Sequence, residues 1–275
     1  MSYTSILVHA CPDRSRMARL RCATELAGEF QATIIGVGAE ALEPIGLSED
    51  VTTSLNREWF DVTRERVVEH LKAAKANFTD VVGDQPHEWR SEWSDPTIAV
   101  TRAAIAADLI VSGGECVAAE SVPYPQVDTG ALIVASGRPV LYCPAYHDRL
   151  SRRPVLIAWK DTREARRAVA DALPLLKRAQ SVTVLEICGP DELESALGRA
   201  TEVAAGLARH GVHASAGSIA RSGTTSDTLL AQADDRGVGL IVAGAYGHSR
   251  LGEWVFGGVT RRLLRQARHF VLFSH

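Results

Sequence analysis

The sequence lacks the features that mark secreted, membrane or nucleic-acid-binding proteins. Its cysteines are an odd number, widely spaced and without a C-x-x-C pair, so they indicate neither a disulfide framework nor a zinc site. No apolar run approaches the roughly 18 residues of a membrane-spanning helix, and the first residues lack the pattern of a secretory signal. A formal net charge of −3 gives no basic excess for nucleic acid. We therefore expect a cytoplasmic protein without membrane or nucleic-acid partners.

Recognisable catalytic and metal-binding motifs are also lacking. There is no ordered Ser, His and Asp set, no Walker lysine and no metal signature. His210 and His213 flank Gly211 but have no third ligand nearby in the sequence, so we expect them on the solvated surface. We assign no catalytic residue and no metal site.

What the sequence does contain is an internal repeat. The apolar run at residues 6–8 corresponds to the run at 155–157, and Thr33–Val37 corresponds to Thr183–Ile187. Leu109 matches Leu240 and Val140 matches Val271 with one shared offset of 131 residues. The boundary between the halves falls in the segment from Pro144 to Pro154, which predicts one domain over residues 1–145 and another over 152–275.

Each half alternates short β-branched runs with helical patterns. This alternation predicts an α/β fold in which βαβ crossovers build a parallel sheet with helices on both faces. Apolar residues at spacings of three and four predict an amphipathic helix over 54–76. Thr162 is a candidate N-cap of a helix that bends or ends near Pro174, and residues 42–52 read as a surface loop.

A glycine pattern follows the apolar run 240–243. Gly244-Ala-Tyr-Gly247 is followed after nine residues by Gly257-Gly258-Val259-Thr260, at the start of a predicted helix over 259–266. Such glycines admit an anion to backbone N–H groups at a helix N-terminus, and they also suit a tight turn. The position after a strand favours a ligand site, because ligands of open α/β sheets bind outside the carboxyl ends of the strands.

The repeat, the opening of the second half at 155–165 and the Gly-x-x-Gly-x9-Gly pattern resemble the universal stress protein family, in particular its tandem members. The resemblance implies two repeated open parallel five-stranded sheets flanked by helices, related to the adenine-nucleotide α-hydrolase fold. It also implies that the second half binds ATP or a related adenine nucleotide. The residues that this resemblance assigns to the phosphates are Gly244, Gly247, His248, Arg250, Gly257, Gly258, Val259 and Thr260. Those assigned to the base and ribose are Ala158, Trp159 and Ile187.

Departures from the family pattern limit what can be carried over. Gly258 stands where nucleotide-binding members have Ser or Thr, and Lys160 stands where they have an acidic residue, so adenine recognition is less well supported than phosphate binding. The first half departs further. Cys11 stands at the acidic position, and Glu115 lies in the loop that corresponds to the glycine pattern of the second half. We expect the first half to bind no ATP and to act as a structural partner.

The resemblance also predicts how the halves associate. In this family the last strand of a domain commonly forms a dimer edge, so residues 140–142 and 271–273 are expected to pair antiparallel within one chain, around a pseudo-twofold axis. A homodimer of whole chains is expected as a further level of association.

The expected function is stress response through association regulated by an adenine nucleotide, with at most slow ATP hydrolysis. Two other functions stay open at this stage. One is a nucleotide-independent interaction protein or scaffold. The other is a carrier that holds a small molecule or lipid between the halves.

Overall fold

The structure, a computed structural model of the 275-residue chain, describes most of the protein. The described residues are 2–12, 17–41, 53–113, 126–145, 149–150, 153–247, 258–266 and 268–275, with the backbone alone described at 53–60.

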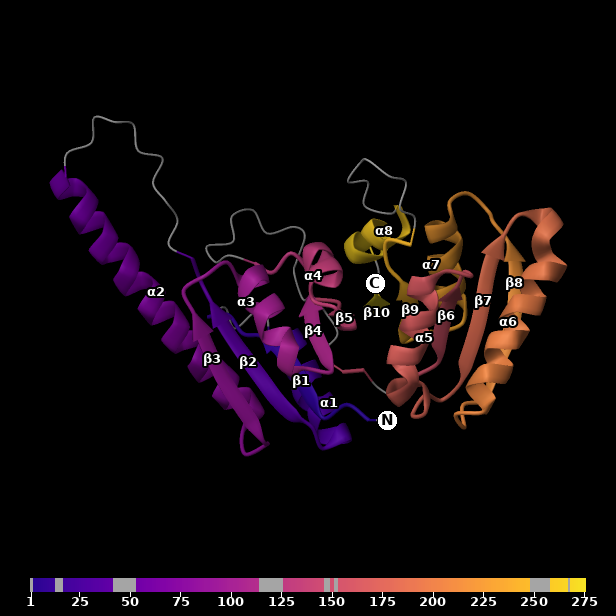
Figure 1. Cartoon of the computed structure of the whole chain (residues 1–275), viewed down its shortest axis with the longest axis horizontal. Helices are drawn as coiled ribbons and strands as arrows, with labels where there is room; N and C mark the ends of the chain where they lie inside the picture. The colour runs from indigo at the N-terminus through magenta and orange to yellow at the C-terminus, as the bar shows by residue number, and fades with distance from the viewer. Residues whose placement is uncertain are drawn as a thin grey trace.

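The centre of the molecule is one ten-stranded sheet with the order β3-β2-β1-β4-β5-β10-β9-β6-β7-β8 (Figure 1). All neighbouring strands are parallel except β5 and β10, so two five-stranded parallel halves meet at a single antiparallel seam. The α/β fold with two repeated parallel sheets is thus confirmed. The strands are β1 (Ser5–His9), β2 (Thr33–Ala39), β3 (His87–Glu92), β4 (Leu109–Gly113), β5 (Val140–Cys143), β6 (Val155–Trp159), β7 (Val182–Cys188), β8 (Ala214–Ala220), β9 (Leu240–Gly244) and β10 (Phe270–Ser274).

The seam between the halves confirms the predicted pairing of the terminal strands. Val271 pairs with Tyr142, Leu272 with Leu141 and Phe273 with Val140. Leu141 and Leu272 are equivalent positions of the repeat and lie opposite each other, so the pseudo-twofold axis passes through this pair. Each half thereby covers a strand edge that would otherwise be exposed.

The register of the sheet corrects one detail of the predicted repeat. Ile6 pairs with Ile34 and Leu109, whereas Val155 pairs with Val182 and Leu240. The offset between Leu109 and Leu240 therefore holds, but Ile34 corresponds to Val182 and not to Val184. A shift of two residues keeps every side chain on its face of the sheet, which is why the apolar pattern alone did not reveal it.

The helices cover both faces of the sheet and pack into two buried apolar clusters. Residues of α1, α2, α5 and α6 belong to one buried apolar cluster, and residues of α3, α4, α7 and α8 to the other. Equivalent helices share a face because the pseudo-twofold axis runs perpendicular to the sheet. The α-helices are α1 (Ala18–Phe30), α2 (Thr53–Val82), α3 (Pro96–Ala103), α4 (Thr129–Ala135), α5 (Arg163–Leu176), α6 (Leu193–Ala208), α7 (Thr225–Asp235) and α8 (Gly258–Gln266).

Local sequence signals account for the helix that opens the second half. Thr162 caps α5, because its hydroxyl accepts a hydrogen bond from the backbone N–H of Ala165 at 3.3 Å, and the helix ends two residues after Pro174. Both predictions are confirmed. The helix expected over 54–76 is also present, although α2 continues to Val82. The predicted surface loop at 42–52 lies outside the described residues.

The halves also touch beside the seam, where α1 faces α5. The hydroxyl of Tyr3 donates to the backbone oxygen of Asp171 at 2.6 Å. The guanidinium of Arg178 lies 4.5 Å from the centre of the Phe30 ring and 3.6 Å from the carboxylate of Glu29. Among the described residues, no helix is both long and apolar enough to cross a membrane.

Candidate ligand-binding pocket

A pocket of about 330 Å³ opens at the carboxyl ends of the second-half strands. It lies at the switch point of the half-sheet, where β6 is flanked by β9 on one side and β7 on the other. Its volume is within the usual range of about 300 to 1,000 Å³ for small-molecule sites. The pocket is lined by Ala158, Trp159, Lys160, Thr162, Ala165, Leu185, Ile187, Thr225, Leu229, Ala243, Gly244, Tyr246, Gly247, Gly258, Val259 and Thr260.

The structure brings the predicted site residues together. Every one of them that it describes lines the pocket: Ala158, Trp159, Ile187, Gly244, Gly247, Gly258, Val259 and Thr260. The others, His248, Arg250 and Gly257, lie outside the described residues. The pocket gathers these residues from three strands and a helix. Their role as ligand contacts stays a prediction.

Sequence reasoning missed several residues that line the pocket. Thr225 and Leu229 come from α7, which carries no motif and lies well before the glycine pattern in the sequence. Thr162 follows β6 directly and was expected only as a helix cap. Tyr246 stands between the pattern glycines, where its side chain received no role. Proximity to the strand ends was the only signal that could have indicated the last two.

The pattern glycines serve different purposes. A Cβ atom on Gly244 would lie 2.5 Å from the backbone nitrogen of Ala165, so this glycine lets α5 approach β9. A Cβ on Gly247 would lie 2.9 Å from a carboxylate oxygen of Glu164. A Cβ on Gly258 would meet no atom of the described residues within 4 Å. The structure therefore gives packing reasons for the first pair, whereas Gly258 borders open space at the start of α8.

A buried carboxylate lies beside the pocket. Glu164 is in the first turn of α5 and forms an ion pair with Arg163 at 3.0 Å. Burial acts to raise the pKa of the Glu164 carboxyl, but hydrogen bonds from its own backbone N–H, from Arg163 and from Thr162 outweigh burial and leave this pKa below its ordinary value. Glu164 is therefore ionised at neutral pH and already paired, with its negative charge offset before any ligand arrives.

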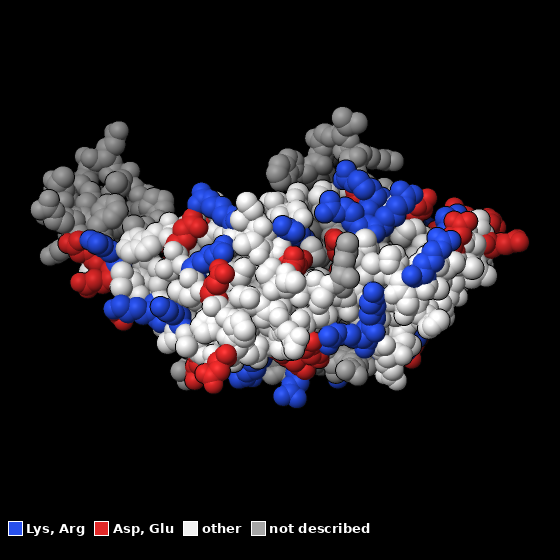
Figure 2. Space-filling view, turned by 60° about the horizontal axis from the view of Figure 1, so that its bottom comes forward, with Lys and Arg blue, Asp and Glu red and all other residues white. Residues whose placement is uncertain are grey.

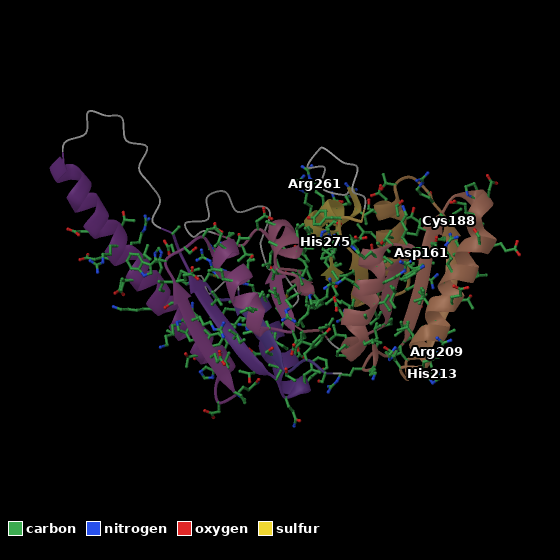
Figure 3. All side chains as sticks on the ribbon, in the orientation of Figure 1. Asp161, Cys188, Arg209, His213, Arg261 and His275 are labelled. Carbon is green, nitrogen blue, oxygen red and sulfur yellow. The ribbon has the colours of Figure 1, made fainter. Side chains whose placement is uncertain are left out.

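Positive charge lies on the other side of the pocket, on α8. Its N-terminus contributes Gly258, Val259 and Thr260 to the wall, and a helix N-terminus carries about half a positive charge. Arg262, in the next turn, pairs with Asp227 of α7 at 2.9 Å. Figure 2 shows blue side chains gathered over this part of the surface, and Figure 3 shows Arg261 at the same edge of the molecule as Asp161 and Cys188. The pocket thus has an apolar floor and one electropositive wall.

Two further features describe the pocket wall. The backbone of Tyr246 is left-handed at φ 57°, an uncommon conformation for a residue with a side chain. Burial raises the pKa of the Tyr246 hydroxyl, with a smaller contribution from Asp128 of the first half. The indole nitrogen of Trp159 is buried and has no hydrogen-bond partner among the described residues.

The corresponding place in the first half holds a buried arginine among its described residues. By the sheet register, His9 and Gly113 are the counterparts of Ala158 and Gly244. The buried side chain of Arg19 donates to the backbone oxygens of both, at 2.9 Å and 3.0 Å, and also to the Cys11 sulfur at 3.3 Å. A separate cavity of about 10 Å³ beside His9 and Cys11 is bordered by α2, on the other face of the sheet from α3 and α4. Residue 115 lies outside the described residues.

Metal ligands do not cluster in the described part of the chain, where no group of three or more His, Cys, Asp and Glu side chains could hold an ion. The four described cysteines, Cys11, Cys22, Cys143 and Cys188, are buried and form no disulfide with one another.

The sheet order and the pocket at its switch point place the molecule among the doubly wound α/β proteins, which bind ligands outside the carboxyl ends of their strands. Within that class, the model of the universal stress protein family matches residues 151–275. The second half of the chain therefore matches the universal stress protein family, as the sequence predicted.

Solved structures extend the likeness in fold to the whole chain. A universal stress protein from Archaeoglobus fulgidus DSM 4304 has a TM-score of 0.71 and 16% identity, with 98% of this chain and 95% of that chain covered. A functionally unknown protein from Pseudomonas aeruginosa PAO1 has a TM-score of 0.63 and 16% identity, with 99% and 92% covered. A universal stress protein in complex with cAMP is 22% identical over 52% of this chain and 98% of its own, with a TM-score of 0.31. No curated protein matches the sequence.

Proposed function

We propose that this chain is a stress-response protein that binds an adenine nucleotide, ATP or a close relative, in the second-half pocket. The observation that carries the proposal is the pocket itself, which joins an apolar recess to a helix N-terminus at the switch point of the sheet. That pairing suits a ligand with one flat apolar part and one anionic part. The cytoplasm is the expected location, because the described cysteines form no disulfide with one another.

The two sides of the pocket suggest how such a ligand would lie. Ala158, Leu185 and Ile187 provide the apolar surface for a base. The start of α8 faces the phosphates with backbone N–H groups and the hydroxyl of Thr260. The buried indole N–H of Trp159 borders the recess, and a ligand acceptor would supply the partner that the described residues do not. Lys160, at the rim, suits phosphate better than an adenine amino group, because it has no acceptor.

Binding is better supported than catalysis. The described side chains that line the pocket include no carboxylate, imidazole or thiol that would act as a general base or nucleophile. The neighbouring Glu164 is held by Arg163 and by the start of α5. We therefore propose a ligand-responsive protein that acts by association, with a second copy or another protein, and that turns over ATP slowly if at all.

One nucleotide per chain is the expected stoichiometry. In the first half Arg19 occupies the place that corresponds to the pocket, and its guanidinium bonds to the backbone there. The carrier alternative has less support, because the cavity between α1 and α5 measures about 30 Å³, far below the size of a lipid. The scaffold alternative predicts no saturable nucleotide binding at all.

Gly258 offers a clean test of this proposal. Because a side chain there would enter open space, Gly258→Leu should fold normally and fill the phosphate end of the pocket. Calorimetry with ATP should show one saturable site in the unchanged protein and at least about tenfold weaker binding in this variant, which corresponds to about 1.4 kcal/mol.

The matched control is Gly198→Leu. Gly198 is exposed on α6, and a Cβ there also meets no atom within 4 Å, so this variant should bind ATP as the unchanged protein does. Absence of saturable binding at millimolar ATP in the unchanged protein, or equal loss in both variants, would refute the nucleotide proposal. Light scattering with and without ATP would report association of chains in the same samples.

A further inference from the structure

Another cavity, of about 250 Å³, lies at the amino ends of the second-half strands, at the opposite edge of the sheet from the ligand-binding pocket. Three separate segments meet around it: the connection between the halves, the turn from α7 into β9 and the turn from α8 into β10. It is lined by Arg149, Leu150, Arg153, Asp234, Gly237, Val238, Gly239, Arg268, His269 and Phe270. We name it the arginine cavity.

The arginine cavity has an excess of positive charge. Arg149, Arg153 and Arg268 border it, and Asp234 is the one carboxylate among its described lining residues. The carboxylate of Asp234 is already engaged, since it lies 3.2 Å from Nε2 of His269. Neither Arg149 nor Arg268 forms an ion pair with any described residue. Arginines such as Arg149 and Arg268, which border a cavity and pair with no described carboxylate, are well suited to an external anion.

The backbone around the arginine cavity is fixed by its own hydrogen bonds. The N–H of Gly239 donates to the oxygen of Pro154 at 2.9 Å, and the N–H of Phe270 donates to the oxygen of Gly239 at 3.1 Å. A Cβ on Gly239 would lie 2.5 Å from Cβ of Arg153, so the stem of this arginine packs against the glycine. These backbone donors are used, and the guanidinium groups of Arg149 and Arg268 remain to bind a ligand.

The negative ends of two helices offset only part of the positive charge around the arginine cavity. Both α7 and α8 end at this edge of the sheet, at Asp235 and Gln266, and a helix C-terminus carries about half a negative charge. Among the described residues, two such ends together with Asp234 do not balance three arginines, so this described lining is net positive.

We propose that the arginine cavity binds a compact polyanion with phosphoryl groups, such as a pyrophosphate moiety. Its volume lies below the usual range for larger organic ligands, about 300 Å³ and above, which favours a small and highly charged occupant. Arg is the side chain whose planar fork binds phosphoryl oxygens in pairs. Because Arg149 belongs to the connection between the halves and Arg268 to the α8–β10 turn, the anion holds these two segments together.

Inorganic pyrophosphate is the probe for the test, and full-length Gly258→Leu is the background, because this change is expected to weaken binding at the ligand-binding pocket. Calorimetry in 150 mM salt should show one saturable site. Removing both unpaired arginines, with Arg149→Ala and Arg268→Ala, should weaken binding at least about tenfold. Arg268→Lys keeps the positive charge but loses the planar fork that binds two phosphoryl oxygens at once. It should give an intermediate loss of pyrophosphate affinity.

The control is Arg209→Ala, which removes an exposed arginine at the same edge of the second-half sheet but outside the arginine cavity (Figure 3). This variant should bind pyrophosphate like the background protein. Absence of saturable binding at millimolar pyrophosphate would overturn the proposal, and so would equal losses in the Arg209 variant and the double variant. Since every sample carries the same Gly258→Leu change, the differences between samples do not depend on the ligand-binding pocket.

Discussion

At the residue scale, the two halves use the same position of the fold in opposite ways. Ala158 and Gly244 leave room for a ligand in the second half, whereas Arg19 bonds to the backbone of their counterparts in the first. The sequence predicted a first half without ATP from Cys11 and Glu115. It did not reveal that an arginine fills the place, because an arginine in a helix is usually on the surface and nothing local marks it as buried.

Buried beside Arg19, His9 should make the protein sensitive to acid. Burial, together with the positive charge of Arg19, lowers the pKa of His9 from 6.5 to about 3. Below about pH 6.5 the His9 side chain binds a proton in the unfolded chain but not in the folded protein. Its contribution to the free energy of unfolding is therefore complete above that pH and is lost as the pH falls toward 3. Between pH 8 and pH 5 this group alone should remove about 2 kcal/mol from the free energy of unfolding.

Urea unfolding at pH 8, 6.5 and 5 measures this effect. The variant His9→Gln should lose part of the pH dependence, whereas the exposed His213→Gln should keep all of it. Proton NMR of the unchanged protein supplies an independent reading, since the His9 resonance should not titrate between pH 8 and pH 5. Titration near pH 6.5 would contradict the buried, neutral state.

At the element scale, the pocket depends on how closely α5 approaches β9. Sequence periodicity predicted the strand, the cap at Thr162 and the helix, and the glycine pattern predicted where the strand ends. Two contributions could not be predicted. Leu229 and Thr225 reach the pocket from α7, and only the folded chain brings that helix beside α8. The packing role of Gly244 was equally hidden, because a glycine needed for close approach and a glycine needed for a ligand look the same in a sequence.

Gly244→Ala tests the contact between α5 and β9. The added methyl group would lie 2.5 Å from the backbone nitrogen of Ala165, so the helix must move, at a cost of about 1 to 3 kcal/mol in the free energy of unfolding. Gly258→Ala adds the same methyl group to open space and should change stability by less than about 0.5 kcal/mol. Urea denaturation compares the two, and equal stabilities would show that α5 tolerates the added group without cost.

At the scale of the whole molecule, the seam turns two similar halves into one sheet. The sequence predicted this arrangement because residues 140–142 and 271–273 repeat at one offset and because strand edges favour pairing. Tyr3, Phe30 and Arg178 add contacts beside the seam that could not be predicted, since each joins elements far apart in the chain. Association between chains stays a prediction for the same reason: the repeat identifies the surfaces shared by the two halves and says nothing of the outer ones.

The seam should make the two halves unfold together, and substitutions in its central residue pair, Leu141 and Leu272, test this expectation. Leu141 and Leu272 are fully buried and face each other on the pseudo-twofold axis. Replacing either with Ala should cost about 2 to 5 kcal/mol, because each change leaves a cavity in a packed core. If the halves form one cooperative unit, Leu141→Ala should lower the protection of backbone amides in both halves by the same free energy, although the change is made in the first.

Hydrogen exchange read by mass spectrometry follows each half separately in one sample. Leu156→Ala, at a buried position of β6 outside the seam, is the matched comparison and should also lower protection in both halves. Loss of protection confined to the half that carries the substitution would mean that the halves unfold independently. In that case the antiparallel pair would join two separately stable domains, and a ligand in the second-half pocket would leave the stability of the first half unchanged.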